Sequence, residues 1–104
     1  MTETVTARSG VPIRLTAERW AHIVEEHGEM AGLRQEVLLT VGKAEAVHWG
    51  SRGELLACRG LDSHLALVVV YRETSATDGF IITAFLTSRP ERLKRRPRQW
   101  PPPT

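Results

Sequence analysis

A chain of 104 residues is the size of one domain and is long enough to bury a hydrophobic core. The single cysteine, Cys58, excludes an internal disulfide framework and favours a reducing, cytoplasmic location. The net charge of +2 is unevenly distributed, because residues 89–98 hold six basic residues and one acidic residue. This concentration indicates either an anionic partner or a solvated tail.

The N-terminal part of the chain predicts a helical region. Residues 1–12 have no regular apolar period and are expected to form a flexible N-terminus without a signal peptide. Thr16 is a good N-cap for a helix that Gly28 would end. Apolar spacing then predicts a second helix over about residues 33–41. One face of the first helix carries Trp20, Ile23, Val24 and His27, whereas His22 falls on the opposite, acidic side.

Alternating apolar residues predict four strands, at residues 44–49, 55–59, 65–72 and 79–86. The gaps between them are short and rich in turn residues, so the strands are expected to form an antiparallel meander. The predicted fold class is therefore α+β, with two N-terminal helices packed on a four-stranded antiparallel sheet whose other face is partly open. Residues 13–88 would form this single domain. Residues 89–104 would form a basic, proline-rich tail outside the sheet, and the longest apolar run, residues 65–71, is too short to cross a membrane.

Polar residues of the predicted sheet suggest a catalytic site. Strand alternation places Ile81, Thr83 and Phe85 on one face. Arg59, and either Tyr71 or Arg72, could join Thr83 there, and His27 could reach the rim. Metal-independent RNA cleavage needs a base and an acid, for which histidine is suited, and donors for the phosphate charge, for which arginine is suited. Each of these residues also has an ordinary structural role at its position, so the set is sufficient for the chemistry but not specific to it.

The C-terminal tail is the second candidate region. Trp100 could stack on a base or could pack the tail against the domain. No cysteine pair or histidine pair has the spacing of a metal site, and no phosphate-binding loop is present, so neither a metal nor a cofactor is expected. The predicted nucleic-acid-binding residues are Arg92, Lys94, Arg95, Arg96, Arg98 and Trp100.

Several segments together resemble a known family. They are the helix motif at residues 13–23 with His27, the strand at residues 67–70, the Gly-Phe-Ile-Ile-Thr-Ala-Phe strand at residues 79–85, and the basic tail ending in Trp100. Over about residues 13–100 the chain resembles the phage-associated branch of the barnase–EndoU–colicin–RelE-like nuclease superfamily. The resemblance implies two helices against a four-stranded antiparallel sheet and a metal-independent RNase, often a toxin or effector. It places the site at His27 or His22, at Arg59 or Arg72, and at Thr83.

Two functions from different classes follow from these observations. The first is a cytoplasmic RNase-like domain that cleaves RNA by attack of the 2′-hydroxyl, with RNA and a cognate inhibitor protein as partners. The alternative is a non-catalytic module of the same fold that binds nucleic acid or protein. The sequence leaves open whether the protein is an enzyme, and it gives no oligomeric state.

Overall fold

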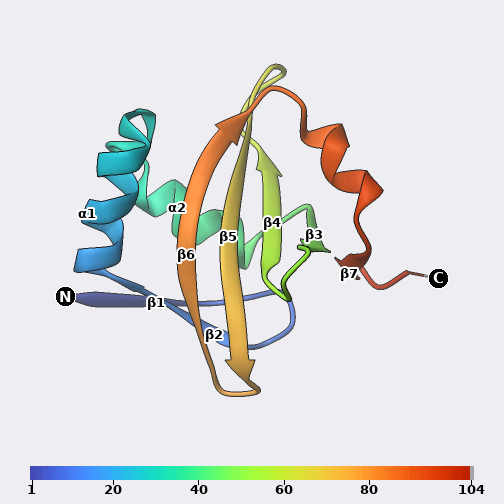
Figure 1. Ribbon diagram of the computed structural model, residues 1–104, viewed down its shortest axis with the longest axis horizontal. Helices are drawn as coiled ribbons and strands as arrows, with labels where there is room; N and C mark the ends of the chain where they lie inside the picture. Colours follow the sequence, from blue (N-terminus) through green and yellow to red (C-terminus); the bar gives the residue numbers. More distant parts are fainter. Residues whose placement is uncertain (104) are drawn as a thin grey trace.

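The computed structural model describes residues 1–103 and shows two α-helices, two short 3₁₀ helices and a seven-stranded mixed sheet (Figure 1). The strand order is β1-β2-β6-β5-β4-β3-β7, in which the β2–β6 contact is parallel and the others are antiparallel. The elements are β1 (Thr2–Thr6), β2 (Pro12–Thr16), α1 (Ala17–Glu26), η1 (Gly28–Met30), α2 (Arg34–Gly42), β3 (Ala46–Trp49), β4 (Leu55–Gly60), β5 (Ala66–Ser75), β6 (Asp78–Thr87), η2 (Pro90–Arg95) and β7 (Arg98–Trp100).

The two predicted helices are present. The hydroxyl of Thr16 accepts a hydrogen bond from the Arg19 amide at 3.0 Å, which caps the start of α1. Apolar side chains on one side of each helix are fully buried, among them Ile23 on α1 and Val37 and Val41 on α2. Both helices therefore bury an apolar stripe against the same face of the sheet, which we call the core face.

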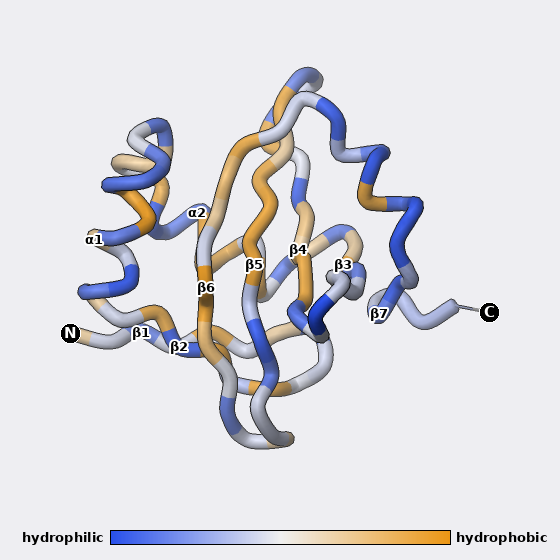
Figure 2. Tube along the Cα trace, in the orientation of Figure 1, coloured by the Kyte–Doolittle hydropathy of each residue, from blue (hydrophilic) through white to orange (hydrophobic). Residues whose placement is uncertain are grey.

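The four predicted strands are also present as the consecutive strands β3 to β6. β5 is the middle strand of the sheet and β6 lies beside it, as expected for strands that are apolar on both faces. Leu67, Val69 and Tyr71 of β5 are fully buried on the core face. The hydropathy colouring shows this apolar centre along β5 and β6 (Figure 2).

The predicted four-stranded antiparallel architecture is wrong, because the sheet has seven strands and is mixed. The resemblance implied the same four-stranded antiparallel sheet, and this part of what it implied is wrong for the same reason. Two of the extra strands come from the predicted flexible N-terminus and its neighbour: β1 pairs with β2 along its whole length. β2 then joins β6 in parallel through Arg14 and Phe80. A third extra strand, β7, comes from the predicted tail and pairs with β3.

Glycine is required where β6 passes closest to β2. A Cβ atom on Gly79 would lie 2.5 Å from Cδ1 of Ile13 and 2.6 Å from the carbonyl oxygen of Arg72. Both distances are far below van der Waals contact, so a larger residue would push the strands apart. The absence of a side chain at this position lets β6 pair with β5 on one side and β2 on the other.

A β-bulge in β6 changes which side chains share a face. Val70 pairs with Thr83 and Tyr71 pairs with Ile81, so Ile82 is the additional residue of the bulge. As a result, Ile81 and Ala84 both belong to the buried core. Strict alternation had placed Ile81 on the same face as Thr83, and this expectation is wrong because the bulge shifts the register.

The two ends of the sheet approach each other through the β1–β2 loop. Nε of Arg8 in this loop donates a hydrogen bond to the carbonyl oxygen of Ala44 at 3.0 Å. Its guanidinium lies 4.2 Å from the centre of the Trp100 ring on β7. The strongly curved sheet therefore wraps around its core, and the first and last strands of the order are linked. Among residues 1–103, no helix is long and apolar enough to span a membrane.

Candidate nucleic-acid interface

The two histidines predicted as catalytic bases lie at the helical side of the molecule. His22 is exposed on α1, with Nε2 3.1 Å from the carboxylate of Glu26. His27 ends α1, and its Nδ1 is 3.7 Å from the carboxylate of Glu29. Because α1 packs against the core face, neither histidine shares a face with Thr83.

Arg59 also faces the helices. Side chains alternate between the two faces along β4, so Arg59 lies on the same face as the buried Ala57 and on the opposite face from Cys58. The side chain of Arg59 therefore points toward α2. Nε donates a hydrogen bond to the hydroxyl of Thr40 at 3.2 Å, and the guanidinium forms an ion pair with Glu36. Arg59 therefore connects the sheet to α2.

Arg72 and Thr83 lie on the opposite face, which we call the outer face. Arg72 follows the core residue Tyr71 along β5, and Thr83 precedes the core residue Ala84 along β6. Because neighbouring side chains of a strand point to opposite faces, both side chains point away from the helices. Arg72 donates a hydrogen bond to the carbonyl oxygen of Arg52 in the β3–β4 turn at 3.1 Å. The hydroxyl of Thr83 is buried and makes no hydrogen bond within residues 1–103. The five residues predicted as catalytic are therefore divided: Arg72 and Thr83 lie on the outer face, and the other three lie on the helical side.

The basic segment, residues 89–98, has a defined path along one side of the sheet. Pro90 begins η2, where its fixed φ and missing N–H are well tolerated. The segment then leaves η2, and the Pro97 carbonyl oxygen accepts a hydrogen bond from the Trp49 amide at 2.8 Å. This contact leads into β7, which pairs with β3. Figure 2 shows η2 and β7 as mostly hydrophilic and set apart from the apolar central strands.

The cations of the basic segment are exposed and lack acidic partners. Within residues 1–103, none of the six forms an ion pair, although five ion pairs occur elsewhere. The positive charge of this segment is therefore available to solvent or to a ligand. The six residues are Arg89, Arg92, Lys94, Arg95, Arg96 and Arg98.

A groove runs between β3 and the basic segment. Two hollows of about 290 and 440 Å³ share four lining residues, so they adjoin. The smaller hollow extends toward Cys58 and Leu93, and the larger toward Pro101. We call the larger hollow the basic groove; its polar lining residues are Glu45, His48, Lys94, Arg96 and Arg98.

His48 is the buried polar residue of the basic groove. Its exposed fraction is 5%, and its Nδ1 lies 3.1 Å from the carbonyl oxygen of Arg96. Because a carbonyl oxygen only accepts, Nδ1 must donate a proton to this hydrogen bond. Nε2 of the neutral ring is then an unprotonated acceptor, and Nε2 of the charged ring is a donor. Either form can contact a polar ligand in the groove.

The Cys58 thiol and two carboxylates restrict the chemistry and the ligands that the groove region can support. Burial, with a smaller effect from Glu45, raises the pKa of the Cys58 thiol, which disfavours the reactive thiolate. Glu45 lines both hollows and Glu91 lines only the smaller one. In the basic groove, three cations therefore face one carboxylate. The electrostatics favour an anionic ligand that makes several contacts.

Trp100 packs the end of the chain against the domain. It packs against the buried core, and the Arg8 guanidinium covers one face of its ring. This arrangement matches the alternative in which the tryptophan packs the tail against the domain. Trp100 fixes the end of the basic segment next to the groove.

Sequence reasoning did not single out His48. The strand over residues 44–49 was predicted, and alternation would have placed His48 opposite the buried Val47. The sequence did not reveal the partner of His48, because the Arg96 carbonyl lies 48 residues farther along the chain and is brought back by the pairing of β7 with β3. Without that contact, a histidine in a strand did not indicate a functional site.

The structure gives no basis for a metal site in residues 1–103, where no three histidine, cysteine, aspartate or glutamate side chains are grouped closely enough to hold an ion. The basic groove is instead suited to an anion. No protein-family model, curated protein or solved structure matches this chain.

Proposed function

We propose that the protein binds RNA through the basic groove and the exposed cations of residues 89–98. The observation that carries this proposal is the set of six cations without ion pairs, held beside a groove with a buried histidine. A phosphate backbone supplies evenly spaced negative charges that such a row can neutralise. Because these cations form no ion pairs in residues 1–103, no internal salt bridge must be broken before RNA binds. The single cysteine and the absence of disulfides favour a cytoplasmic site of action.

Salt dependence tests this proposal directly. Binding of a fluorescently labelled single-stranded RNA should weaken steeply as salt rises, with a slope that counts the neutralised phosphates. The double variant Lys94→Gln and Arg96→Gln removes two cations of the groove. It should reduce the logarithmic salt slope by about 1.4, because each phosphate contact on a single strand contributes about 0.7.

A matched control removes the same charge elsewhere. Arg19 and Lys43 are exposed at the helical side of the molecule, so the variant Arg19→Gln with Lys43→Gln should retain the original slope. Equal losses in the two double variants would show that only net charge matters. A flat response to salt would exclude RNA as the partner.

A second candidate function is cleavage of the bound RNA without a metal ion. His48 favours it, because its Nδ1 is fixed by the Arg96 carbonyl and Nε2 remains available as a base. In this reaction Nε2 takes the proton of the 2′-hydroxyl, and the 2′-oxygen attacks phosphorus. The 5′-oxygen then leaves, takes a proton from water, and a 2′,3′-cyclic phosphate remains. Arg96, Arg98 and Lys94 would stabilise the charge on the phosphate.

Incubation of RNA with the pure protein in a chelator distinguishes binding from cleavage. Cyclic phosphate ends should form with the native protein and with His27→Ala and His22→Ala, but not with His48→Gln. Loss of product in His27→Ala alone would instead support the residue that the sequence and the resemblance favoured. Intact RNA under conditions of full binding would leave the non-catalytic function.

A further inference from the structure

The outer face of the sheet carries both phenylalanines of the chain. Phe80 adjoins the buried Gly79 and Ile81, and Phe85 adjoins the buried Ala84, so alternation turns both rings away from the core. Neither ring is fully buried. They share this face with Leu56, Cys58 and Val70, which are partly exposed, and with Val68, which is fully buried between Cys58 and Phe85.

The described chain covers this face only in part: Val68 is fully buried, whereas both phenylalanines are partly exposed. Both α-helices pack on the core face, and α2 lies behind the sheet in Figure 1. No ribbon crosses in front of the middle of β5 and β6 in that view. η2 borders the face from the side of β3 and β4, where it forms the smaller hollow with Ala46 and Cys58. Phe80 and Phe85 nevertheless keep part of their surface exposed.

Phe85 lies near the smaller hollow, which adjoins the basic groove. Pairing aligns Ala46, Cys58, Val68 and Phe85 on successive strands. Since neighbouring strands are about 4.8 Å apart, Phe85 is two strand spacings, or about 10 Å, from Cys58 at the edge of the smaller hollow. A chain of a few nucleotides can span this separation. Arg72 pairs with Phe80 and adds a cation beside the second ring.

We infer that the outer face binds single-stranded RNA by stacking unpaired bases on Phe85 and Phe80 while the basic groove holds the backbone. This inference rests on the proposed function. Charge complementarity selects the occupant. Two partly exposed rings lie on the same face as a hollow that adjoins the unpaired cations. Unpaired nucleotides supply both flat apolar bases and phosphates. Bases within a duplex are stacked on each other, so their faces cannot reach the rings.

Two variants of Phe85 test the inference. Phe85→Leu keeps an apolar side chain but removes the ring, and it should weaken binding of a single-stranded oligonucleotide by about tenfold or more. Phe85→Tyr keeps a ring and should retain nearly the original affinity. The salt slope should be the same for both, because stacking neutralises no phosphate. Melting temperature, measured on each variant, identifies any loss that comes from unfolding.

A duplex of the same sequence serves as the control ligand. Its affinity should be unchanged in Phe85→Leu, since the basic segment alone would hold it. Equal weakening of the duplex and the single strand would overturn the stacking inference, as would unchanged single-strand affinity in Phe85→Leu. Both results leave salt-dependent RNA binding intact, whereas failure of the native protein to bind either RNA overturns the proposed function itself. In that last case the apolar face would be a surface for a protein partner.

Discussion

Two threonine hydroxyls of similar burial have opposite surroundings. The hydroxyl of Thr40 accepts a hydrogen bond from Arg59, whereas the hydroxyl of Thr83 is buried without a partner in residues 1–103. A buried hydroxyl that makes no hydrogen bond costs roughly 1–3 kcal/mol. We expect Thr83→Val to raise the free energy of unfolding by about 1 kcal/mol, because valine keeps the shape and suits a strand.

Thr40→Val is the matched comparison. It removes a hydrogen bond from a charged group and should lower the free energy of unfolding by about 1–3 kcal/mol. Urea unfolding of both variants checks the contrast. A loss of stability in Thr83→Val would show that its hydroxyl is satisfied by solvent, and a fall in RNA turnover without loss of stability would restore Thr83 as a site residue.

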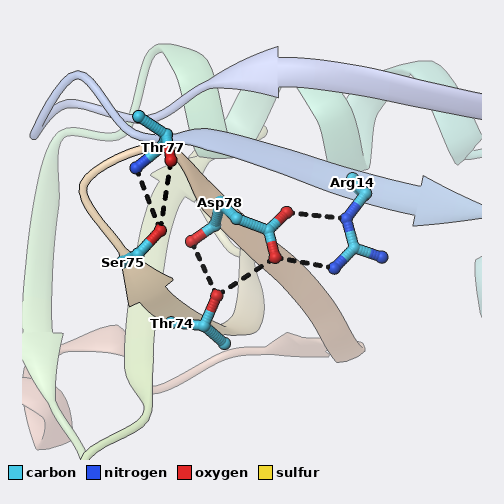
Figure 3. A network of polar contacts seen from close by, with 5 residues as sticks. All are labelled: Arg14, Thr74, Ser75, Thr77 and Asp78. Atoms are coloured by element: carbon cyan, nitrogen blue, oxygen red, sulfur yellow. Dashed lines mark hydrogen bonds and ion pairs between the residues drawn. The ribbon is translucent and has the colours of Figure 1, made fainter.

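At the level of the elements, one charged pair supports the parallel contact between β2 and β6. The Arg14 guanidinium forms two hydrogen bonds with the Asp78 carboxylate, at 2.8 and 2.9 Å, and the Thr74 hydroxyl donates a third at 3.1 Å (Figure 3). These bonds, led by that from Arg14, lower the pKa of Asp78. The pair connects β2 to the β5–β6 hairpin at the point where β2 and β6 meet.

The lowered pKa of Asp78 predicts a dependence of stability on acid. A carboxyl group whose pKa is lower in the folded state stabilises the protein above its unfolded pKa of about 4, and this contribution is lost as pH falls through the folded pKa. Asp78→Asn should therefore melt at a lower temperature than the native protein at pH 7. The difference should begin to shrink below about pH 4, where the unfolded chain binds a proton at Asp78, and it should vanish as pH falls through the lowered pKa of the folded state.

Thermal melts of both proteins between pH 7 and pH 2 provide the measurement. Glu25 is an exposed carboxylate without an ion pair in the described residues, and Glu25→Gln should follow the native curve throughout. A difference between Asp78→Asn and the native protein that is constant with pH would contradict the electrostatic explanation.

The same elements show how far local sequence could predict the fold. Helix caps, apolar periods and turn residues are local signals, and they were enough for α1, α2 and the strands β3 to β6. β1 and β7 are short, polar strands whose stability comes from pairing with β2 and β3, so their own composition gave little sign of strand structure. The bulge at Ile82 is likewise set by tertiary pairing. The basic segment was predicted from charge alone, but the groove and His48 needed the return of β7 to β3.

For the molecule as a whole, both ends of the chain complete the fold. Arg8 near the N-terminus contacts Ala44 and Trp100, and β7 pairs with β3. Deletion of residues 89–104 would therefore remove a strand as well as six cations. A truncated protein cannot separate RNA binding from stability, which is why the charge variants above are the better test.

Trp100 offers a single-residue test of this closure. Its ring packs against the core and under Arg8, so Trp100→Ala should lower the free energy of unfolding by about 2 kcal/mol or more. Trp49, on β3 next to β7, is 38% exposed, and Trp49→Ala should cost less than about 1 kcal/mol. Urea unfolding compares the two variants. If Trp100 also holds the basic segment in place, RNA affinity should fall in Trp100→Ala under conditions where that variant is still folded. Equal stability of the two variants would mean that the chain ends are not joined in the way that Arg8 and Trp100 indicate.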